Sequence, residues 1–549
     1  MQHVSENWKG VQRQQLVNET YVEISFDIAD PDAVADATSE DNGAIYIADT
    51  AQIVSEVDKN IVPYATLEEN LWLLDGSRRF IPGDNYGDNG FIGNTLSKGD
   101  GGFDKNPVIN IKFTKTHKPI IPGITITWGI AYDEYAEVFK VTAYNGDTVV
   151  AEKRIDDNTS VKSVVELDIE NYSLIRVEVI KWCLPYHRPR VAEIFVGVNK
   201  VFDKSNITGY EHEQEISPIG ATTPINKVGF SVDNSDNIFD PNNITGVSKY
   251  LMERQEMRVR YGMKLNDGTI EYIPAGVFYL SQWDAPQNGI EASFTARDLL
   301  EFLRKNYAKG EYKPEGISLY DLAIDVLNTA NLPLNDDGSV KWVVDDSLKD
   351  IRTVAPLPVK PLSECLQYIA QAAACILYCD REGVLHIEPI STVPSDYALT
   401  SFNMFSRPEV SLLKPLKEVS VRVYDYSVGE DTDVTLKDDG ELTITVGGDR
   451  LESKYTEHVI EVSKDGETQV VDNPLITSTA HAERVGEWVR DWLSYRKLIT
   501  MGDWRADPRL DATDIITSEN KYSTDTVRMT SVKYTYAGAF KANGEGVIM

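Results

Sequence analysis

Apolar and polar residues alternate with period two along much of this chain, which is the pattern of β-strands that bury one face. The first example is Tyr21 to Ile28, which ends at Asp30-Pro31. A shorter strand candidate, Ala44 to Ile47, and an apolar segment, Leu71 to Leu74, follow in a more polar stretch. Residues 1–78 hold too little apolar material for a core of their own, so we expect their strands to dock on another domain.

Between about residues 79 and 197 the strand candidates become frequent, and turns rich in Gly, Asn and Asp separate them. Strands at this spacing predict a β-sandwich. The order of their apolar and aromatic positions resembles that of the galactose-binding-like (discoidin-like) jelly rolls. The seven strands are expected at Val108 to Phe113, Ile124 to Trp128, Val138 to Tyr144, Thr148 to Lys153, Val161 to Ile169, Leu174 to Trp182 and Val191 to Val198.

The stretch from Phe230 to Asn243 combines the end of a strand with a loop rich in Asn and Asp. The side chains of such residues bond nearby backbone groups and end the ladder of a sheet. Further strands are expected at Met257 to Tyr261, Gly276 to Trp283 and Ile290 to Thr295, followed by a helix whose apolar face holds Ala296, Leu299, Leu300 and Leu303. Residues 198–305 therefore predict a small β-barrel closed by a helix.

Residues 306–410 change to helical periodicity and predict an α+β middle segment. Ser318 caps the first helix, with Asp321 at its third position, and Pro361 begins the second. The second helix leads into two strands joined by a turn, Asp380-Arg381-Glu382-Gly383.

Residues 411–549 predict a second barrel with one helix. The strand pattern returns at Val419 to Tyr424 and continues at Val434 to Val446, Tyr455 to Val462 and Val527 to Tyr536. An amphipathic helix precedes the last strand and places Val485, Trp488, Val489 and Trp492 on one side. The expected fold class is thus a multi-domain, β-rich α+β protein.

Three short motifs resemble the tail-hub (baseplate-hub) family of tailed bacteriophages. They are Asp233-Asn-Ser-Asp236 with Phe239-Asp-Pro241, Thr295-Ala-Arg-Asp298, and the turn Asp380 to Gly383, and they occur in the order of that family. Asn237 stands where Gly is common, and Asn also tolerates positive φ. The resemblance implies two barrels per chain that form, in a homotrimer, a pseudo-sixfold ring matching a hexameric tail tube.

Composition narrows the classes of partner. The chain of 549 residues is 42% hydrophobic, enough for several domains, and no apolar run approaches the roughly 18 residues of a membrane helix. The N-terminus, from Met1 to Asn7, shows no secretory signal. With 54 basic and 86 acidic residues the formal charge is −32, which opposes the counterion release that drives binding to nucleic acids. DNA is therefore expected only in transit, not bound.

No catalytic constellation emerges from the sequence, so no catalytic residue, metal or cofactor is assigned. The four cysteines, Cys183, Cys365, Cys375 and Cys379, match neither a disulfide framework nor a zinc module and suit buried apolar positions. A loop with Asp84, Asn85, Asp88 and Asn89 favours a turn over a calcium site. Glu211-His212-Glu213 is interpreted as a solvated strand edge.

Two aromatic loops of the sandwich are the candidate contact site for a glycan or a protein partner. Aromatic faces stack on sugars, and Arg and His add hydrogen bonds. Packing of the same side chains in the core, or against a neighbouring subunit, is the favoured alternative. The candidate residues are Trp128, Tyr132, Tyr135, Trp182, Tyr186, His187 and Arg188.

The leading hypothesis is a structural virion protein: the homotrimeric hub of a phage tail tip, assembled in the host bacterial cytoplasm. Its ring would continue the tail tube for DNA ejection and contact tail-tube, distal-tail and other baseplate proteins. Its sandwich would face outward for baseplate contact or host attachment. The competing hypotheses are a cell-wall glycan-degrading enzyme with an accessory carbohydrate-binding module, and a receptor-binding adhesin.

Overall fold

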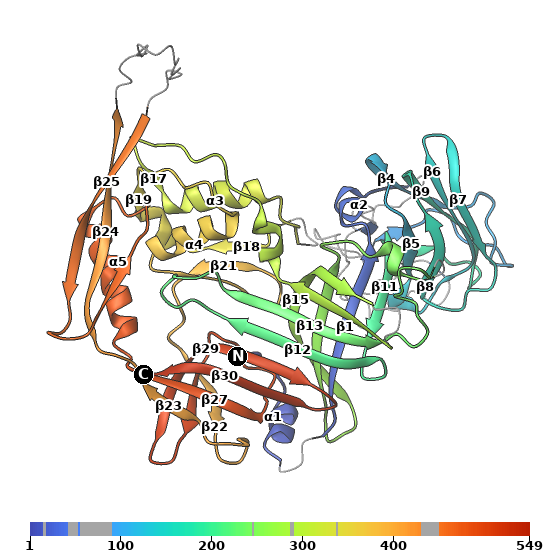
Figure 1. The fold of residues 1–549 in the computed structure, drawn as a ribbon. Helices are drawn as coiled ribbons and strands as arrows, with labels where there is room; N and C mark the ends of the chain where they lie inside the picture. Colours follow the sequence, from blue (N-terminus) through green and yellow to red (C-terminus); the bar gives the residue numbers. More distant parts are fainter. Residues whose placement is uncertain are drawn as a thin grey trace.

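The computed structural model describes residues 1–14, 18–41, 53–54, 68, 90–243, 246–285, 290–335, 339–429 and 450–549. The strand candidates at 44–47 and 434–446, the apolar segment at 71–74 and the loop at 84–89 lie outside these residues. Figure 1 shows a broad sheet at the bottom of the molecule, a helical region above it and a separate pair of sheets to the right. The fold is confirmed as multi-domain and β-rich with α+β content.

The broad sheet has thirteen strands and encloses the first hydrophobic core together with helix α1 (Glu6–Gln12). Side-chain capping by Ser5 starts this helix, which buries Trp8 and Val11. The path through the sheet is β11 (Gly197–Phe202), β1 (Thr20–Ala29), β14 (Glu256–Lys264), β15 (Ile270–Asp284), β16 (Glu291–Arg297), β13 (Ile225–Asp233), β12 (Ile207–Glu215), β29 (Thr524–Tyr536), β30 (Phe540–Ile548), β27 (Lys497–Arg505) and β23 (Glu409–Leu412), with β28 (Ile515–Glu519) on β29 and β22 (Pro394–Leu399) on β28.

The two expected barrels are joined into one open sheet, and neither closes within the described residues. Strand β12 pairs with β13 on one edge and with β29 on the other, from Tyr210 opposite Tyr536 to Glu215 opposite Ser531. The barrel prediction was wrong because β12 meets a strand of the C-terminal unit with its second edge instead of returning to its own unit. The N-terminal strand β1 lies between β11 and β14, so its two edges are both paired.

The sandwich consists of two sheets that face each other across the third hydrophobic core. The first six predicted strands are confirmed, and the seventh divides at Val196, beyond which the chain enters the broad sheet as β11. Helix α2 (Pro31–Asp36) also packs here through Ala33. One sheet contains β3 (Phe91–Ile92), β10 (Arg190–Phe195), β5 (Ile121–Trp128) and β8 (Lys162–Ile169), and the other contains β2 (Thr38–Asp41), β4 (Val108–His117), β9 (Tyr172–Trp182), β6 (Ala136–Asn145) and β7 (Thr148–Ile155).

The helical region is built around α3 (Leu319–Ala330) and α4 (Leu362–Ala372), and its core also takes in α5 (Thr479–Leu493). Ser318 caps α3 as predicted, since its Oγ accepts from Asp321 N at 3.0 Å. The strands of this region are β17 (Ile317–Ser318), β18 (Trp342–Val344), β19 (Arg352–Thr353), β20 (Ile376–Cys379), β21 (Leu385–Glu388), β24 (Leu416–Gly429), β25 (Arg450–Glu461) and β26 (Glu467–Val471).

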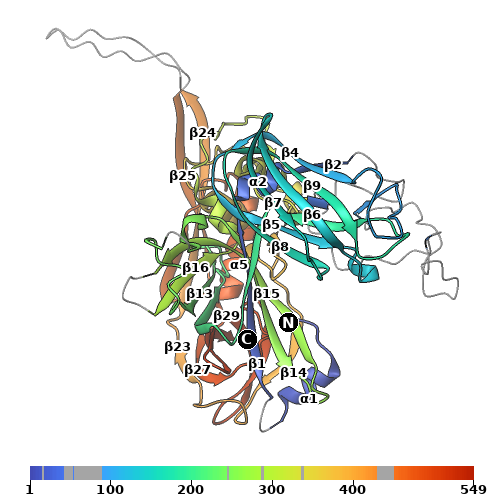
Figure 2. The same ribbon diagram turned by 90° about the vertical axis from the view of Figure 1, so that its right-hand side faces the viewer.

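Two further expectations are corrected. Residues 411–549 do not form one unit, because β24, β25 and β26 make a separate sheet whose inner face packs on α5, while β23 and β27–β30 join the broad sheet. The helix expected after Ala296 is a short 3₁₀ helix, Leu299–Arg304. It ends early because two backbone hydrogen bonds hold the following residues extended: Tyr307 N donates to Lys360 O, and Leu362 N donates to Lys305 O. The hairpin β24–β25 packs on α5 near its base, and its far end projects beyond the rest of the described chain in both views (Figures 1 and 2).

Candidate functional site

The turn between β20 and β21 carries Arg381 out of the helical region and into the broad sheet. Asp380 shapes this turn, since its Oδ1 accepts from Glu382 N at 3.0 Å and from Val384 N at 2.9 Å. Gly383 adopts a left-handed backbone with φ +78°. A Cβ there would lie 2.9 Å from that of Val277, so only glycine fits without displacement. The sequence Asp-Arg-Glu-Gly thus fixes the direction in which Arg381 points.

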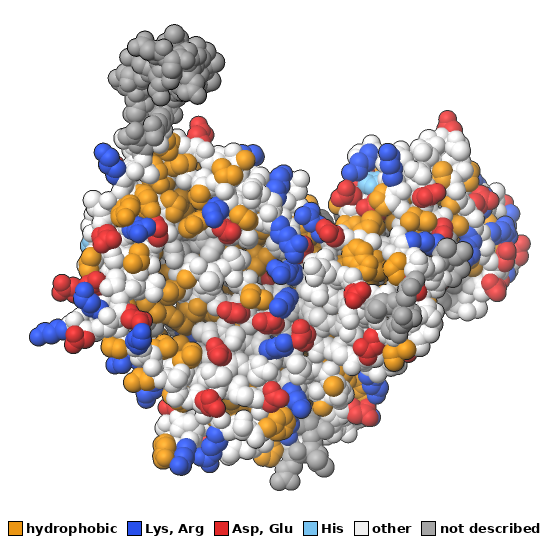
Figure 3. Space-filling model, in the orientation of Figure 1, with side chains coloured by type: hydrophobic (Ala, Val, Ile, Leu, Met, Phe, Trp, Pro, Cys, Tyr) orange, Lys and Arg blue, Asp and Glu red, His pale blue; other side chains and the backbone are white. Residues whose placement is uncertain are grey.

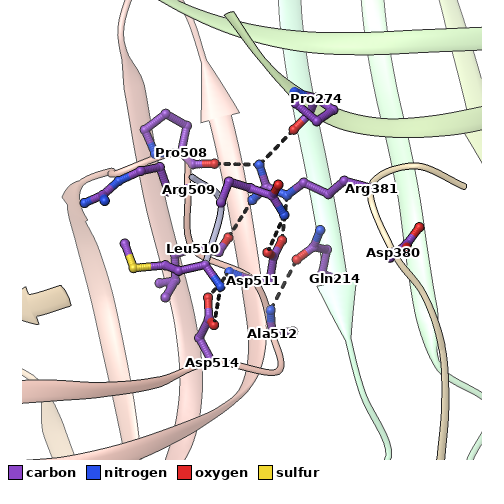
Figure 4. Close-up of polar contacts among 12 residues, drawn as sticks. Gln214, Pro274, Asp380, Arg381, Pro508, Arg509, Leu510, Asp511, Ala512 and Asp514 are labelled. Atoms are coloured by element: carbon purple, nitrogen blue, oxygen red, sulfur yellow. Dashed lines mark hydrogen bonds and ion pairs between the residues drawn. The ribbon is translucent and has the colours of Figure 1, made fainter. Parts of the chain in front are cut away.

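The Arg381 guanidinium, 3% exposed, connects the helical region to both halves of the broad sheet (Figure 4). Its Nε donates to Asp511 Oδ1 at 2.6 Å. Its Nη1 donates to the carbonyl of Pro274 at 3.0 Å, in β15, and to that of Pro508 at 2.8 Å. Its Nη2 donates to the carbonyl of Leu510 at 2.9 Å. One side chain therefore satisfies acceptors from segments more than a hundred residues apart, which we call the Arg381 junction.

The electrostatics of the Arg381 junction keep the guanidinium charged. Burial lowers the pKa of the guanidinium, but Asp511 and Tyr534 together raise this pKa by more than burial lowers it. The pKa of Arg381 therefore lies above its ordinary value. Burial raises the pKa of the neighbouring Asp514 carboxyl, and the nearby Asp511 adds to this effect. The amino group of Met1 lies 2.7 Å from Asp514 Oδ1 and offsets part of the burial cost.

A buried hydrogen-bond chain beside the junction contains His212, which the sequence placed on a solvated strand edge. The structure corrects this interpretation: His212 is fully buried. Its Nδ1 lies 2.7 Å from Tyr261 Oη and its Nε2 lies 2.9 Å from Asn226 Oδ1. Tyr261 Oη is also 2.8 Å from Tyr210 Oη. Burial lowers the pKa of His212 to about 4, so the ring is neutral at pH 7.

A cavity of about 200 Å³ adjoins the junction and is bounded by Gln214, Asp298, Cys379 and Arg381, among others. Burial raises the pKa of the Asp298 carboxyl to about 6. Burial and the adjacent Asp298 raise the pKa of the Cys379 thiol well above its ordinary value, which disfavours the nucleophilic thiolate. Within the described residues, no group of three or more His, Cys, Asp or Glu side chains is arranged to hold a metal ion. The geometry is that of a locked joint between units.

The two aromatic loops of the sandwich lie side by side, but most of their side chains face inward. Trp128 and Trp182 are fully buried, with ring centroids 6.2 Å apart, and so cannot meet a glycan as the sequence hypothesis requires. Tyr132 and Tyr135 are half-buried, and the Arg190 guanidinium lies over the Tyr132 ring at 4.4 Å. The two tryptophans are buried because each lies at the end of a strand with its side chain facing the core between the two sheets.

His187 lies in a buried ionic network that sequence analysis missed, and Arg188 joins it through its backbone N–H, which donates to Glu68 Oε1. His187 Nδ1 lies 2.8 Å from Glu134 Oε1, and Trp182 Nε1 donates to Glu134 Oε2 at 2.8 Å. Arg190 pairs with Glu68 and, at 3.4 Å, with Glu134. The sequence feature that could have indicated this network is an acidic residue, Glu134, between two tyrosines. Its partners lie about 50 residues further along the chain, so the sequence alone does not identify them.

Tyr186 is the one predicted contact residue in the described part of the sandwich whose side chain is mainly exposed, at 51%. Its φ of +59° is left-handed, which is unfavourable for a residue with a large side chain. Its ring hydroxyl approaches Gly99, where an added Cβ would lie 3.1 Å away. The exposed part of the candidate contact site thus contracts to Tyr186 and the flanking Leu184, which is 41% exposed.

Comparisons with known proteins give matches among solved structures alone. No family model matches the sequence, and no curated protein matches it. Among the described residues, no helix is both long and apolar enough to cross a bilayer.

The chain is similar in structure to several phage tail proteins. A 43 kDa tail protein of prophage MuSo2 from Shewanella oneidensis is 12% identical, with a TM-score of 0.41, over 64% of this chain and 96% of that chain. A tail protein from Neisseria meningitidis is 11% identical, with a TM-score of 0.40, over 64% and 94%. A prophage tail protein from Listeria monocytogenes is 8% identical, with a TM-score of 0.38, over 64% and 91%.

Proposed function

We propose that this chain is a structural protein of a phage tail tip, the hub of a homotrimeric ring that continues the tail tube. The observation that carries the proposal is the Arg381 junction, which joins the helical region to both halves of the thirteen-stranded sheet. A ring subunit has to transmit load between its units without hinging. A buried guanidinium with four protein acceptors meets that requirement, because each bond holds only in one geometry.

The motifs of the hub resemblance fall on structural corners of this architecture. The loop after β13 is stabilised by its own Asx side chains: Asp233 Oδ1 accepts from Ser235 N at 2.9 Å and Asn234 Oδ1 accepts from Phe239 N at 3.0 Å. Asn237 takes the left-handed conformation, with φ +57°, at the position where Gly is common in the family. Asp298 caps the 3₁₀ helix, and Arg381 forms the junction. These residues support a role in shape rather than in catalysis.

The sandwich supports the second part of the proposal, an outward module for contact with baseplate proteins or the host surface. It lies at the side of the molecule, beyond β11 and away from the helical region (Figure 1). The exposed, conformationally strained Tyr186 favours a host-surface glycan as its ligand, because an aromatic face stacks on sugars. Glycan-array binding by the full chain, lost in Tyr186→Ser, is the expected result, and equal binding by both proteins would remove this role.

The acidic excess supports passage of DNA without binding. Acidic and basic side chains are interspersed over the face shown in Figure 3, so this face carries no continuous acidic patch despite the net charge of −32. In the proposed ring the remaining acids line the lumen, where they repel the phosphate backbone. A reconstruction of the ring with a neutral or basic lumen would contradict this idea.

The ring is tested by the mass of the purified full-length chain in solution and by electron microscopy of particles. A trimer by light scattering, together with ring density at the tail tip that fits the chain, is expected. A protein that stays monomeric at high concentration, with no such density, overturns the proposal. Release of reducing sugar from purified cell walls, abolished by one Asp or Glu substitution, would instead establish the glycan-degrading enzyme.

A further inference from the structure

One end of the broad sheet is an exposed edge strand. All four residues of β23 are exposed, including Val410 at 45% and Leu412 at 69%. The strand pairs with β27 on one side, and no described strand pairs with its other side. Leu413 N donates to Arg496 O on the β27 side, so by the alternation of a strand the N–H groups of Leu412 and Val410 point to the open side. Such an edge is a template for pairing with another chain.

The opposite end of the same sheet is β11, which pairs with β1 on one side. Its first residues lie against the sandwich, where Thr125 Oγ1 donates to Gly197 O. Its remaining residues, 199–202, line a groove of about 430 Å³ together with the Asx-rich loop 233–239. No described strand fills this groove. Val201, at its edge, is 50% exposed.

These two edges are suited to each other in length and charge. The open part of β11 is four residues long, as is β23. The groove carries Asp233 and Asp236 on its loop and Lys200 on its strand. The segment at β23 offers Arg407 opposite in charge to the loop acids and Glu409 opposite in charge to Lys200, and both side chains are exposed. The edges lie on opposite sides of the molecule in Figure 1, so they cannot meet within one chain.

We propose that β23 of one copy adds to β11 of the next copy, in the groove beside the loop 233–239. Each copy then uses two different surfaces, and the contact is head-to-tail. Repetition around a closed ring joins the broad sheets of all copies through β23 and β11 into one continuous sheet, in which both ends of the eleven-strand path are paired. This inference rests on the homo-oligomeric ring proposed above and identifies its interface.

Three full-length variants test the interface, with oligomeric mass measured by light scattering and native mass spectrometry. The strand variant Val410→Lys/Leu412→Lys puts charge on the β23 edge. The groove variant Val201→Lys/Asp236→Lys puts charge in the groove, where it opposes Arg407. A matched control, Val459→Lys/Val470→Lys, alters two residues on the sheet of β24–β26 that are 43% and 44% exposed. Far-ultraviolet circular dichroism verifies that all three fold.

The strand and groove variants are each expected to be monomeric, and the control to retain the wild-type mass. An equimolar mixture of the strand and groove variants is expected to give a dimer and nothing larger, because each protein keeps one intact edge and these two edges are complementary. If both variants keep the wild-type mass, or their mixture stays monomeric, the edge pairing is wrong while the ring remains. A monomeric wild-type protein contradicts the ring itself.

Discussion

Arg381 Nε donates to Asp511 Oδ1 across 2.6 Å, although 130 positions of sequence separate the two residues. The pair is almost fully enclosed on the Arg381 side and joins the helical region to the loop before β28. It therefore makes the position of one unit depend on the fold of another.

Replacing Arg381 by Met is expected to destabilise the protein by about 3–5 kcal/mol, because it leaves the Asp511 charge and three carbonyl groups without their donor. The apparent urea midpoint measures the loss. The exposed neighbour Glu382 supplies the control, since Glu382→Ala is expected to cost less than about 0.5 kcal/mol. Adding Asp511→Leu to Arg381→Met should restore part of the stability, and a purely additive double variant would show that the two groups do not interact.

Asp298→Asn is expected to stabilise the protein at pH 7. The folded-state pKa of Asp298 is about 6, above the usual 3.8, so the folded state holds the proton more tightly than the unfolded state. The tighter proton binding by the folded state stabilises it fully below pH 3.8, and this stabilisation is lost as the pH rises through 6. The contribution of Asp298 to the free energy of unfolding changes by about 3 kcal/mol over this range. Asn removes that loss and keeps an oxygen for Leu300 N. Melting temperatures at pH 7.5 and 4.5 should differ less in the variant.

The exposed Asp284 in β15 provides the comparison for this experiment. Asp284→Asn is expected to change the free energy of unfolding at pH 7.5 by less than about 0.5 kcal/mol, because the side chain is exposed. A gain for Asp298→Asn that is equal at both pH values would show that the effect is not one of ionisation.

His212 is expected to act in the opposite direction. Its folded-state pKa of about 4 lies below the usual 6.5, so only the unfolded state takes up a proton as the pH falls from 6.5 to 4. That uptake costs the folded state about 3 kcal/mol by pH 4. His212→Gln should be less stable at pH 7 yet lose less stability over this interval, as read from urea midpoints. A variant with the wild-type slope would refute this assignment, and His458→Gln, at a surface ion pair, is the matched histidine control.

The sandwich separates structural from exposed aromatic residues. Trp128→Ala is expected to destabilise the sandwich by about 3–5 kcal/mol, because it empties a fully buried site against Phe139. Tyr186→Gly should instead raise its stability by about 0.5–1 kcal/mol, since glycine accepts φ +59° without strain. Thermal unfolding monitored by tryptophan fluorescence measures the stability of Tyr186→Gly relative to the wild-type protein. Limited proteolysis measures that of Trp128→Ala, because this variant lacks one of the fluorescent side chains. Equal effects of the two changes would contradict this division.

Local features of the fold could be predicted from sequence, but pairing between distant segments could not. Alternation of apolar and polar residues identified the first six sandwich strands and the strand that ends at the 233–239 loop. This was possible because a strand that buries one face needs an apolar residue at every second position. The same alternation does not say which strand lies at the second edge of β12, and so the two barrels were expected to close. Arg381 occupies a turn of polar residues, a setting typical of an exposed side chain. Its acceptors are mostly backbone carbonyls, which leave no trace in residue identity.

The pairing of β12 with β29 also sets an order in time. The residues of β12 end at Glu215, whereas those of β29 begin at Thr524, so the centre of the broad sheet stays incomplete until more than 300 further residues have been synthesised. Long-range strand pairing of this kind is slow to form. For the proposed ring this sets a sequence of events: the broad sheet of a copy is complete, and able to pair with a neighbouring copy, only after β29 has been synthesised.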